Sequence, residues 1–331
     1  MKKLLYIGPG SPYDKYILSS LRKSYGVDYI NQSHLQDCQN LRYRILFKMR
    51  RFQRMENICE NYILKRLQWL CEKRSRKFDM VFIIRGSEIK QSHIDYLRRT
   101  NPGVKIIIFF WDDIARMAKN KNVILGNNFD RRYSFDSADC ERYGFEYHPA
   151  FYVYDKAFGK NPHTKYDLCY IGTEHSNRFE ELCRFKQVLV ENGIKLKFVL
   201  VTSFVPYLKG LFGIDKQRRR EFRMMTVRFW PYRKYLRLMS DSKVVLDLSA
   251  PSQSGISSRT FEALAMGTRI ITSNPAILSE QSIPGDSFLL LDNQIRNEDI
   301  VGFIKDDIPV SFSKEKYSLD CFLDDILNPG L

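Results

Sequence analysis

The chain has 331 residues, of which 44% are hydrophobic and 27% are charged, and its formal net charge is +15. This length and composition predict a globular protein of two domains and exclude an intrinsically disordered chain. The positive charge favours anionic partners, namely phosphate groups, acidic lipid head groups or nucleic acid, without choosing among them. The first apolar run is too short for a signal peptide, and no run approaches the roughly 18–20 residues that cross a bilayer, so we expect a cytosolic protein.

Cysteine and histidine are placed without any metal-binding or disulfide pattern. The seven cysteines are scattered and never form a C-x-x-C pair, and the five histidines lie far apart in the sequence. This arrangement argues against a disulfide framework and against a zinc site. We therefore expect no metal and no cofactor.

The first half of the chain alternates apolar runs with helical segments. Residues 3–7 (KLLYI), 79–84 (DMVFII) and 104–111 (VKIIIFFW) predict buried strands, because each run is nearly continuous in β-branched or aromatic residues. Helices are predicted at about residues 12–24 and at residues 88–99, the second ending before an Asn-Pro-Gly turn. Strands separated by helices predict a parallel sheet.

A second alternating series follows a polar, proline-containing stretch. Its predicted strands are residues 166–171, 196–201, 243–248, 269–272 and 288–291, and its predicted helices are about 176–192, 232–241 and 259–266. We therefore expect an N-terminal domain over 1–150, a linker over 151–165 and a C-terminal domain over 166–310. Residues 311–331 include a helical pattern at about 314–327, which we expect to pack back toward the N-terminal domain.

The stretch from 249 to 274, SAPSQSGISSRTFEALAMGTRIITSN, predicts a loop between two buried strands, with a short helix inside it. Gly255, Ser257 and Ser258 belong to the loop and the helix start, and Gly267 stands where a left-handed residue ends a helix. Loop amides and a helix N-terminus together form an anion site, because their free N–H groups and the helix dipole both face the ligand. A diphosphate suits such a site.

Two charged side chains of this helix extend the hypothesis from a phosphate to a nucleotide. Arg259 offers guanidinium donors to a phosphate, and Glu262, one turn into the helix, offers acceptors to a pair of ribose hydroxyls. The alternative is that Glu262 is a surface residue of the helix and that Ser257 and Ser258 only cap it. Spacing alone does not decide between the two.

The segment RTFEALAMGTRIIT resembles the donor-site motif of GT-B glycosyltransferases, especially relatives of the CgeB spore-maturation proteins and enzymes of capsule and lipopolysaccharide synthesis. YDLCYIGTEHSNRFE resembles the turn that opens their C-terminal domain, and IIFFWDD with SFDSADCERYGFEYHPAFY resembles the end of their N-terminal domain. The resemblance touches about half of the chain. It implies an α/β GT-B fold of two facing Rossmann-like domains, with parallel sheets and an interdomain cleft, and it implies that Glu262 binds the nucleotide ribose.

The sequence departs from this family at one acidic position. Many retaining GT-B enzymes carry two glutamates separated by seven residues, whereas Ser254 stands eight positions before Glu262 here. The missing acid argues against a retaining mechanism without establishing inversion.

Three further residues are candidate donor contacts. Gly172 and Thr173 follow a predicted strand and open a helix, a place where parallel-sheet proteins bind phosphates, although a tight turn alone would also explain them. Trp230 follows a predicted strand edge and offers an aromatic face for the nucleobase, although a tryptophan at such a place is more often part of the core.

Candidates for the acceptor side lie in the N-terminal half. Glu88, Asp112 and Asp113 follow two predicted parallel strands, whose carboxyl ends line ligand sites in open α/β sheets. An inverting reaction needs one carboxylate as general base on the acceptor hydroxyl. The alternative for each is an N-cap or turn carboxylate.

Two segments carry most of the excess positive charge. Residues 42–77 contain twelve basic and three acidic residues, and residues 209–237 contain ten basic and two acidic residues. A solvated helical face explains such segments, and so does attachment to an anionic membrane surface.

We expect a metal-independent, hexosyltransferase-like glycosyltransferase. It would move a sugar from a nucleotide diphosphate sugar to a glycan or lipid-linked acceptor in bacterial surface polysaccharide synthesis, at the inner face of the membrane. The alternatives are a nucleotide-sugar epimerase of the same fold, a non-catalytic partner of another transferase, and a basic nucleic-acid-binding protein, although no nucleic-acid-binding motif is present and no nucleic-acid partner is expected.

Overall fold

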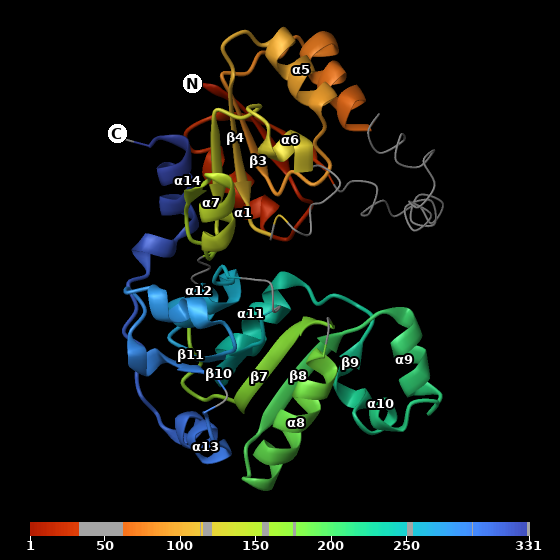
Figure 1. The fold of residues 1–331 in the computed structure, drawn as a ribbon, viewed down its shortest axis with the longest axis vertical. Coiled ribbons are helices and arrows are strands. Elements are labelled where there is room, and N and C mark those ends of the chain that lie inside the picture. The colour runs from red at the N-terminus through yellow and green to blue at the C-terminus, as the bar shows by residue number, and fades with distance from the viewer. Residues whose placement is uncertain are drawn as a thin grey trace. The chain divides into compact units, whose positions relative to one another are not determined.

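The computed structural model describes residues 1–32, 62–112, 114, 121–153, 159–174, 177–249, 254–292 and 294–329. The chain forms two compact units, one of Met1–Pro149 with Leu319–Leu331 and one of Ala150–Ser318. Each unit is built around its own six-stranded sheet, and both appear in Figure 1. Across the helices described, none has the length and apolar character that crossing a membrane requires.

The sheet of the first unit is parallel throughout, with the strand order β2-β1-β3-β4-β5-β6. Its strands are β1 (Lys3–Gly8), β2 (Gly26–Asn31), β3 (Met80–Ile84), β4 (Lys105–Phe110), β5 (Arg131–Ser134) and β6 (Glu146–Tyr147). The central strands β1, β3 and β4 are buried almost along their whole length, which is why each reads as a continuous apolar run in the sequence.

Helices cover both faces of this first sheet. On one face lie the helical stretch 62–68, its π-helical continuation Trp69–Lys73, and α5 (Gln91–Thr100). On the other face lie α1 (Asp14–Leu21) and α14 (Leu319–Leu327), the latter drawn in dark blue in Figure 1. Two further helices in the described part of the unit are α6 (Lys121–Leu125) and α7 (Ser137–Tyr143).

The sheet of the second unit is also parallel, with the strand order β12-β11-β10-β7-β8-β9. Its strands are β7 (Tyr166–Thr173), β8 (Leu196–Val201), β9 (Met225–Thr226), β10 (Ser242–Asp247), β11 (Arg269–Thr272) and β12 (Phe288–Leu290). Counted within the unit this is the order 3-2-1-4-5-6 of doubly wound dinucleotide-binding folds. From β7 the strands are added toward one edge of the sheet and from β10 toward the other edge, so the switch point lies between these two strands.

The second sheet is likewise covered on both faces. The helices α8 and α13 contribute their apolar side chains to one core, and α11 and α12 pack against the sheet from the other side. The helices are α8 (Arg178–Glu191), α9 (Phe204–Leu211), α10 (Lys216–Arg220), α11 (Tyr232–Ser240), α12 (Ser258–Ala265) and α13 (Asn297–Lys305). Short 3-10 turns occur at η3 (Phe222–Met224), η4 (Pro275–Ser279), η5 (Gly285–Ser287) and η6 (Glu315–Tyr317).

The predicted elements of both units are present, mostly to within one or two residues. The strands predicted at 196–201 and 269–272 have the observed bounds, and Gly267 ends α12 with a left-handed φ of 80° as predicted. The sequence did not predict the strands β2, β5, β6 and β9 or the helices α6, α7, α9, α10 and α13. Five cysteines are described and all are free, and no group of His, Cys, Asp and Glu within the described ranges is arranged to hold a metal ion.

Candidate functional site

The carboxyl ends of β7 and β10 form the centre of the candidate site. Because the two strands are parallel neighbours, with Cys169 opposite Val245, both strand ends lie at the same edge of the sheet. Gly172 and Thr173 end β7, and Asp247 ends β10. Open parallel sheets bind ligands beside the carboxyl ends of the strands at the switch point, which is the place these residues occupy.

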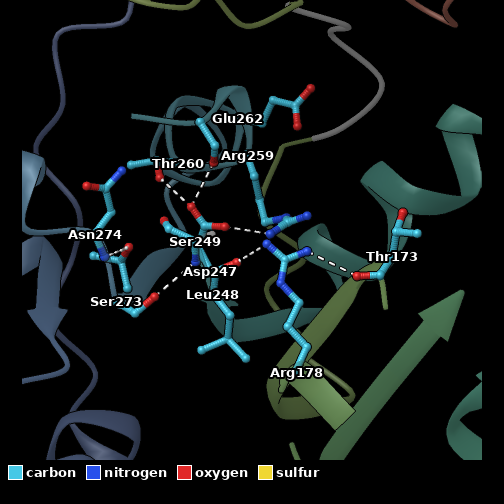
Figure 2. Close-up of polar contacts among 12 residues, drawn as sticks. Thr173, Arg178, Asp247, Leu248, Ser249, Arg259, Thr260, Glu262, Ser273 and Asn274 are labelled. Carbon is cyan, nitrogen blue, oxygen red and sulfur yellow. Dashed lines mark hydrogen bonds and ion pairs between the residues drawn. The ribbon is translucent and has the colours of Figure 1, made fainter. Parts of the chain in front are cut away.

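Asp247 connects the end of β10 to the first turn of α12. Its carboxylate is buried and accepts hydrogen bonds from Arg259 Nη1 at 2.5 Å, Ser257 Oγ at 2.7 Å and Thr260 Oγ1 at 3.2 Å. Figure 2 shows this carboxylate between the helix and the strands. The contact fixes the N-terminal turn of α12 at the switch point.

The start of α12 leaves its backbone amides uncapped by a side chain. Ser257 holds the N-cap position with an extended backbone, but its hydroxyl donates to Asp247 and makes no cap hydrogen bond. Ser258 is the first helical residue, and the buried Gly255 precedes the turn, its carbonyl accepting from Asn274 Nδ2 at 2.8 Å. The interpretation of Ser257 as a mere cap is therefore wrong, and the helix N-terminus keeps the dipole and the N–H groups that an anion site uses.

Arg259 is a fixed cation at the switch point. Burial alone would lower the pKa of its guanidinium, but the Asp247 carboxylate more than offsets this effect and raises the pKa above its ordinary value. The Arg259 side chain is 18% exposed, and its Nε atom is buried without a hydrogen-bond partner among the described residues. The guanidinium thus stays charged and keeps donor capacity.

Gly172 allows Arg259 to lie close to the end of β7. A Cβ atom at position 172 would stand 2.5 Å from the Tyr170 hydroxyl oxygen and 3.4 Å from Arg259 Nη2. No side chain fits there without displacing the tyrosine. The structure therefore brings together two residues that were predicted from different parts of the sequence.

Arg178, at the start of α8, is a second cation at this edge and was not singled out in the sequence analysis. Its Nη1 donates to the carbonyl of Thr173 at 3.0 Å and its Nη2 to the carbonyl of Leu248 at 2.6 Å, so it bridges the two strand ends (Figure 2). Asp247 was also missed. Its signal in the sequence is an acidic residue near the end of the otherwise apolar run VVLDL, since a buried carboxylate needs a charged or hydrogen-bonding partner.

Glu262 lies on α12 one turn beyond Arg259, and its carboxylate points away from Asp247 (Figure 2). It is 1% exposed, so the alternative of a surface helix residue is wrong. Tyr232 and Tyr235 of α11 donate their hydroxyls to its two oxygen atoms at 2.5 and 2.6 Å. Glu262 thereby ties α11 to α12.

Trp230 lies two residues before the start of α11, with Pro231 at the N-cap position between them. The Nζ atom of Lys234 lies 3.8 Å from the centroid of its ring, so a cation covers one face of the indole. A nucleobase at Trp230 would stack on the other face.

The candidates for a catalytic base lie in the first unit. Asp112 follows β4 and forms an ion pair with Arg85 at 3.0 Å. Arg85 follows β3 with a φ of 74°, a left-handed value that is uncommon outside glycine. Glu88 is half-buried in the turn before α5. Asp113 lies outside the described residues, as does most of the basic segment 42–77.

Two comparisons with known proteins agree with this geometry. Solved structures share the architecture over nearly the whole chain, so the chain has the GT-B fold. Sucrose-phosphate synthase from Thermosynechococcus elongatus is 12% identical with a TM-score of 0.60 over 92% of this chain and 89% of that one. A glycosyltransferase involved in avilamycin A biosynthesis is 12% identical with a TM-score of 0.57 over 99% and 96%.

A third solved structure of this fold is an epimerase. The UDP-GlcNAc 2-epimerase from Methanocaldococcus jannaschii is 12% identical with a TM-score of 0.56 over the full length of both chains.

The family model described as glycosyl transferase-like matches residues 187–307, which include α11, α12 and the loop between β10 and α12. A search of curated proteins finds no match. The chain thus has the GT-B fold, and residues 187–307 are similar in sequence to the glycosyl transferase-like family.

Proposed function

We propose that the protein is a glycosyltransferase that binds a nucleotide diphosphate sugar at the switch point of its second unit. The observation that carries this proposal is the cluster of Gly172, Asp247 and Arg259 at the start of α12. A guanidinium held in place by a buried carboxylate, beside an uncapped helix N-terminus, presents positive charge and hydrogen-bond donors where a diphosphate would lie.

The same groups give the proposed reaction its chemistry. Breaking the bond between the sugar and the diphosphate leaves negative charge on the diphosphate oxygens. Donors that are already oriented toward this charge stabilise it without reorganisation. Arg259, Arg178 and the α12 amides supply that stabilisation in the proposal, and we propose that transfer proceeds without a metal ion for this reason.

The nucleoside would lie along α11 and α12. In this proposal Glu262 accepts hydrogen bonds from the ribose hydroxyls. These bonds would replace the ones that Tyr232 and Tyr235 donate to Glu262 in the structure. Trp230 stacks on the base. The acceptor would be a glycan or a lipid-linked glycan of a surface polysaccharide. Glu88, Asp112 and Asp113 remain the candidate bases that would deprotonate its hydroxyl.

A thermal-shift panel of UDP, GDP, ADP, CMP and dTDP sugars tests the donor site. A ligand at about 100 times its dissociation constant stabilises the folded protein by about 2.7 kcal/mol. We expect one nucleotide class to raise the melting temperature of the wild type. Arg259→Lys keeps the charge but loses the planar fork, so we expect donor affinity to fall tenfold or more. Glu262→Gln should lower it by a similar factor.

The matched control is Glu298→Gln, an exposed glutamate of α13 away from the switch point. It should leave donor affinity unchanged. An absence of any shift across the panel would overturn the proposed donor site, as would unchanged affinity in both Arg259→Lys and Glu262→Gln.

Transfer assays repeated in EDTA test metal independence. A loss of turnover that added Mg²⁺ restores would contradict the proposal that transfer proceeds without a metal ion.

An epimerase is the second candidate, because one solved structure that matches over the full length of both chains is an epimerase. The two activities separate in one assay. Incubation with the bound nucleotide sugar and no acceptor would yield an epimerised sugar only if the protein is an epimerase. Product that appears only after a glycan acceptor is added supports the transferase.

A further inference from the structure

The segment that connects β8 to β9 carries an unusual concentration of exposed apolar side chains. Twelve large apolar residues are exposed in the described part of the chain, and five of them lie in this segment, between positions 204 and 214. Within this segment, the side chain of Phe204 is 62% exposed, that of Phe212 71% and that of Ile214 73%. Single exposed apolar residues are ordinary, but a cluster marks an interaction surface.

The helix α9 has apolar side chains on two sides. One side packs on the protein: Tyr207 lies against Phe222 with ring centroids 4.9 Å apart, and a Cβ atom at Gly210 would stand 3.2 Å from the Cβ of Arg218. Helical spacing places Val205 and Phe212 on the opposite side, where both are exposed. A surface helix of a globular protein normally carries polar residues on that side.

The same segment and the residues that follow it are strongly basic. Nine of the ten basic residues between 209 and 237 are exposed, whereas the two acidic residues of that stretch are half-buried. Both acids turn toward the protein, since Asp215 caps α10 and contacts Arg218, and Glu221 pairs with Lys186. The outward surface is therefore cationic and apolar together.

The surface is anchored to the core of the second unit. Arg218 of α10 donates to Glu174 at 2.7 Å and lies 4.2 Å from the ring centroid of Phe179 on α8. These contacts fix α10 with respect to the sheet, and α9 packs on α10 where Gly210 lies against Arg218.

We propose that this face docks on an anionic lipid bilayer. We define the α9–α10 surface by five apolar and five basic residues: Phe204, Val205, Leu211, Phe212 and Ile214, with Lys209, Lys216, Arg219, Arg220 and Arg223. The apolar side chains enter the boundary between head groups and acyl chains, and the basic side chains contact acidic head groups.

The composition of this surface favours a membrane over nucleic acid or a second copy of the chain as its partner. Nucleic acid would pair with the basic residues, but aliphatic side chains such as Val205, Leu211 and Ile214 contribute little to contacts with phosphates or base edges. A second copy of the chain would bring two strongly positive faces together, which costs free energy. Of these three partners, the lipid surface is the one that uses both the apolar and the basic residues.

Flotation of the full-length protein with vesicles tests the proposal without any nucleotide, so its outcome is independent of the donor site. We expect recovery with phosphatidylcholine vesicles that contain phosphatidylglycerol and little recovery with phosphatidylcholine alone. Phe212→Ser with Ile214→Ser should weaken partition about tenfold or more, because two large apolar side chains no longer insert. Lys216→Glu with Arg220→Glu and Arg223→Glu should weaken it about 100-fold or more.

Arg219 is left unchanged in these variants because it donates to the carbonyl of Leu211 at 2.9 Å and so helps to hold the surface in shape. The apolar control is Leu278→Ser with Ile308→Ser, and the charge control is Lys195→Glu with Lys305→Glu and Lys314→Glu, all exposed elsewhere on the same unit. Both controls should float like the wild type.

The depth of insertion gives a second readout. A Phe212→Trp variant should be quenched by brominated lipids, whereas Leu278→Trp should not. Flotation that persists in both surface variants, or a Phe212→Trp indole that brominated lipids do not quench, would overturn the proposal. So would stoichiometric binding of a single-stranded oligonucleotide without flotation, or a dimer that Phe212→Ser with Ile214→Ser dissociates.

Discussion

Asp247 and Arg259 form the charged centre of the candidate site, and each compensates the charge of the other. The Asp247 side chain is 3% exposed, so its charge must be compensated by donors within the protein. Arg259 supplies the opposite charge, and Ser257 and Thr260 supply two hydroxyl donors. The carboxylate in turn fixes the guanidinium beside Gly172. We infer that Asp247 is a positioning residue for Arg259.

Removal of one partner should therefore be costly. Asp247→Ala leaves the Arg259 guanidinium without its carboxylate, and breaking a buried pair in this way costs about 3–5 kcal/mol. We expect urea unfolding to show a loss of free energy near the lower end of that range, because Arg259 keeps some contact with solvent. Donor affinity should fall as well.

A double variant separates the structural from the positioning role. Asp247→Leu with Arg259→Met replaces the pair by apolar side chains and should recover most of the free energy of unfolding. It should not recover donor binding. If the double variant bound nucleotide sugars like the wild type, the two residues would be structural only.

Half of this cluster was predictable from the sequence. Gly172 and Arg259 each stand at a strand-to-helix turn, and such turns have a recognisable pattern of glycine and hydroxyl residues. The contact between them was not predictable from local pattern, because they come from different elements 87 positions apart. Arg178 and Asp247 were missed for the same reason: their roles depend on partners that only the fold brings close.

At the scale of elements, Gly267 ends α12, the helix whose first turn belongs to the candidate site. Gly267 adopts a φ of 80°, and a Cβ atom there would meet no atom nearer than 3.9 Å. Space is therefore available, and only the backbone conformation disfavours a side chain.

Gly267→Ala isolates this conformational cost. We expect a loss of about 1 kcal/mol in the free energy of unfolding, with unchanged donor affinity, because Gly267 stands at the opposite end of α12 from Ser257. Gly302→Ala in α13 is the comparison. Its Cβ would also enter open space, but within a regular helix, so it should stabilise the protein by up to about 1 kcal/mol. Equal losses in both variants would refute the explanation.

Two physical reasons explain why local sequence patterns did not predict some of the elements. Strands β6 and β9 have two residues each, too few for any periodicity. The helix α9 contains Pro206 and Gly210, which usually indicate a turn. Pro206 is tolerated because it lies in the first turn, and Gly210 is needed because Arg218 and Phe222 pack directly against it. Packing between elements thus overrides local propensity.

At the scale of the whole molecule, the chain crosses between its two units twice. It leaves the first unit after Pro149 and returns to it at Leu319, so the last helix α14 packs on a sheet formed by the first 149 residues. Phe322 of α14 is fully buried there, with its ring centroid 4.8 Å from that of Phe109 and 6.5 Å from that of Phe82. At the surface of the same unit, Asp320 pairs with Lys23 of the α1 region at 2.9 Å.

Phe322→Ala should consequently weaken the first unit and leave the second unit unchanged. Truncation of a buried phenylalanine costs about 3–5 kcal/mol, through lost apolar contact and the cavity that remains. In scanning calorimetry we expect one unfolding component to move to lower temperature. A bound nucleotide sugar should still raise the other component, because every proposed donor contact belongs to the unit of Ala150–Ser318. A ligand shift confined to the component that Phe322→Ala weakens would place the donor in the first unit and contradict the assignment.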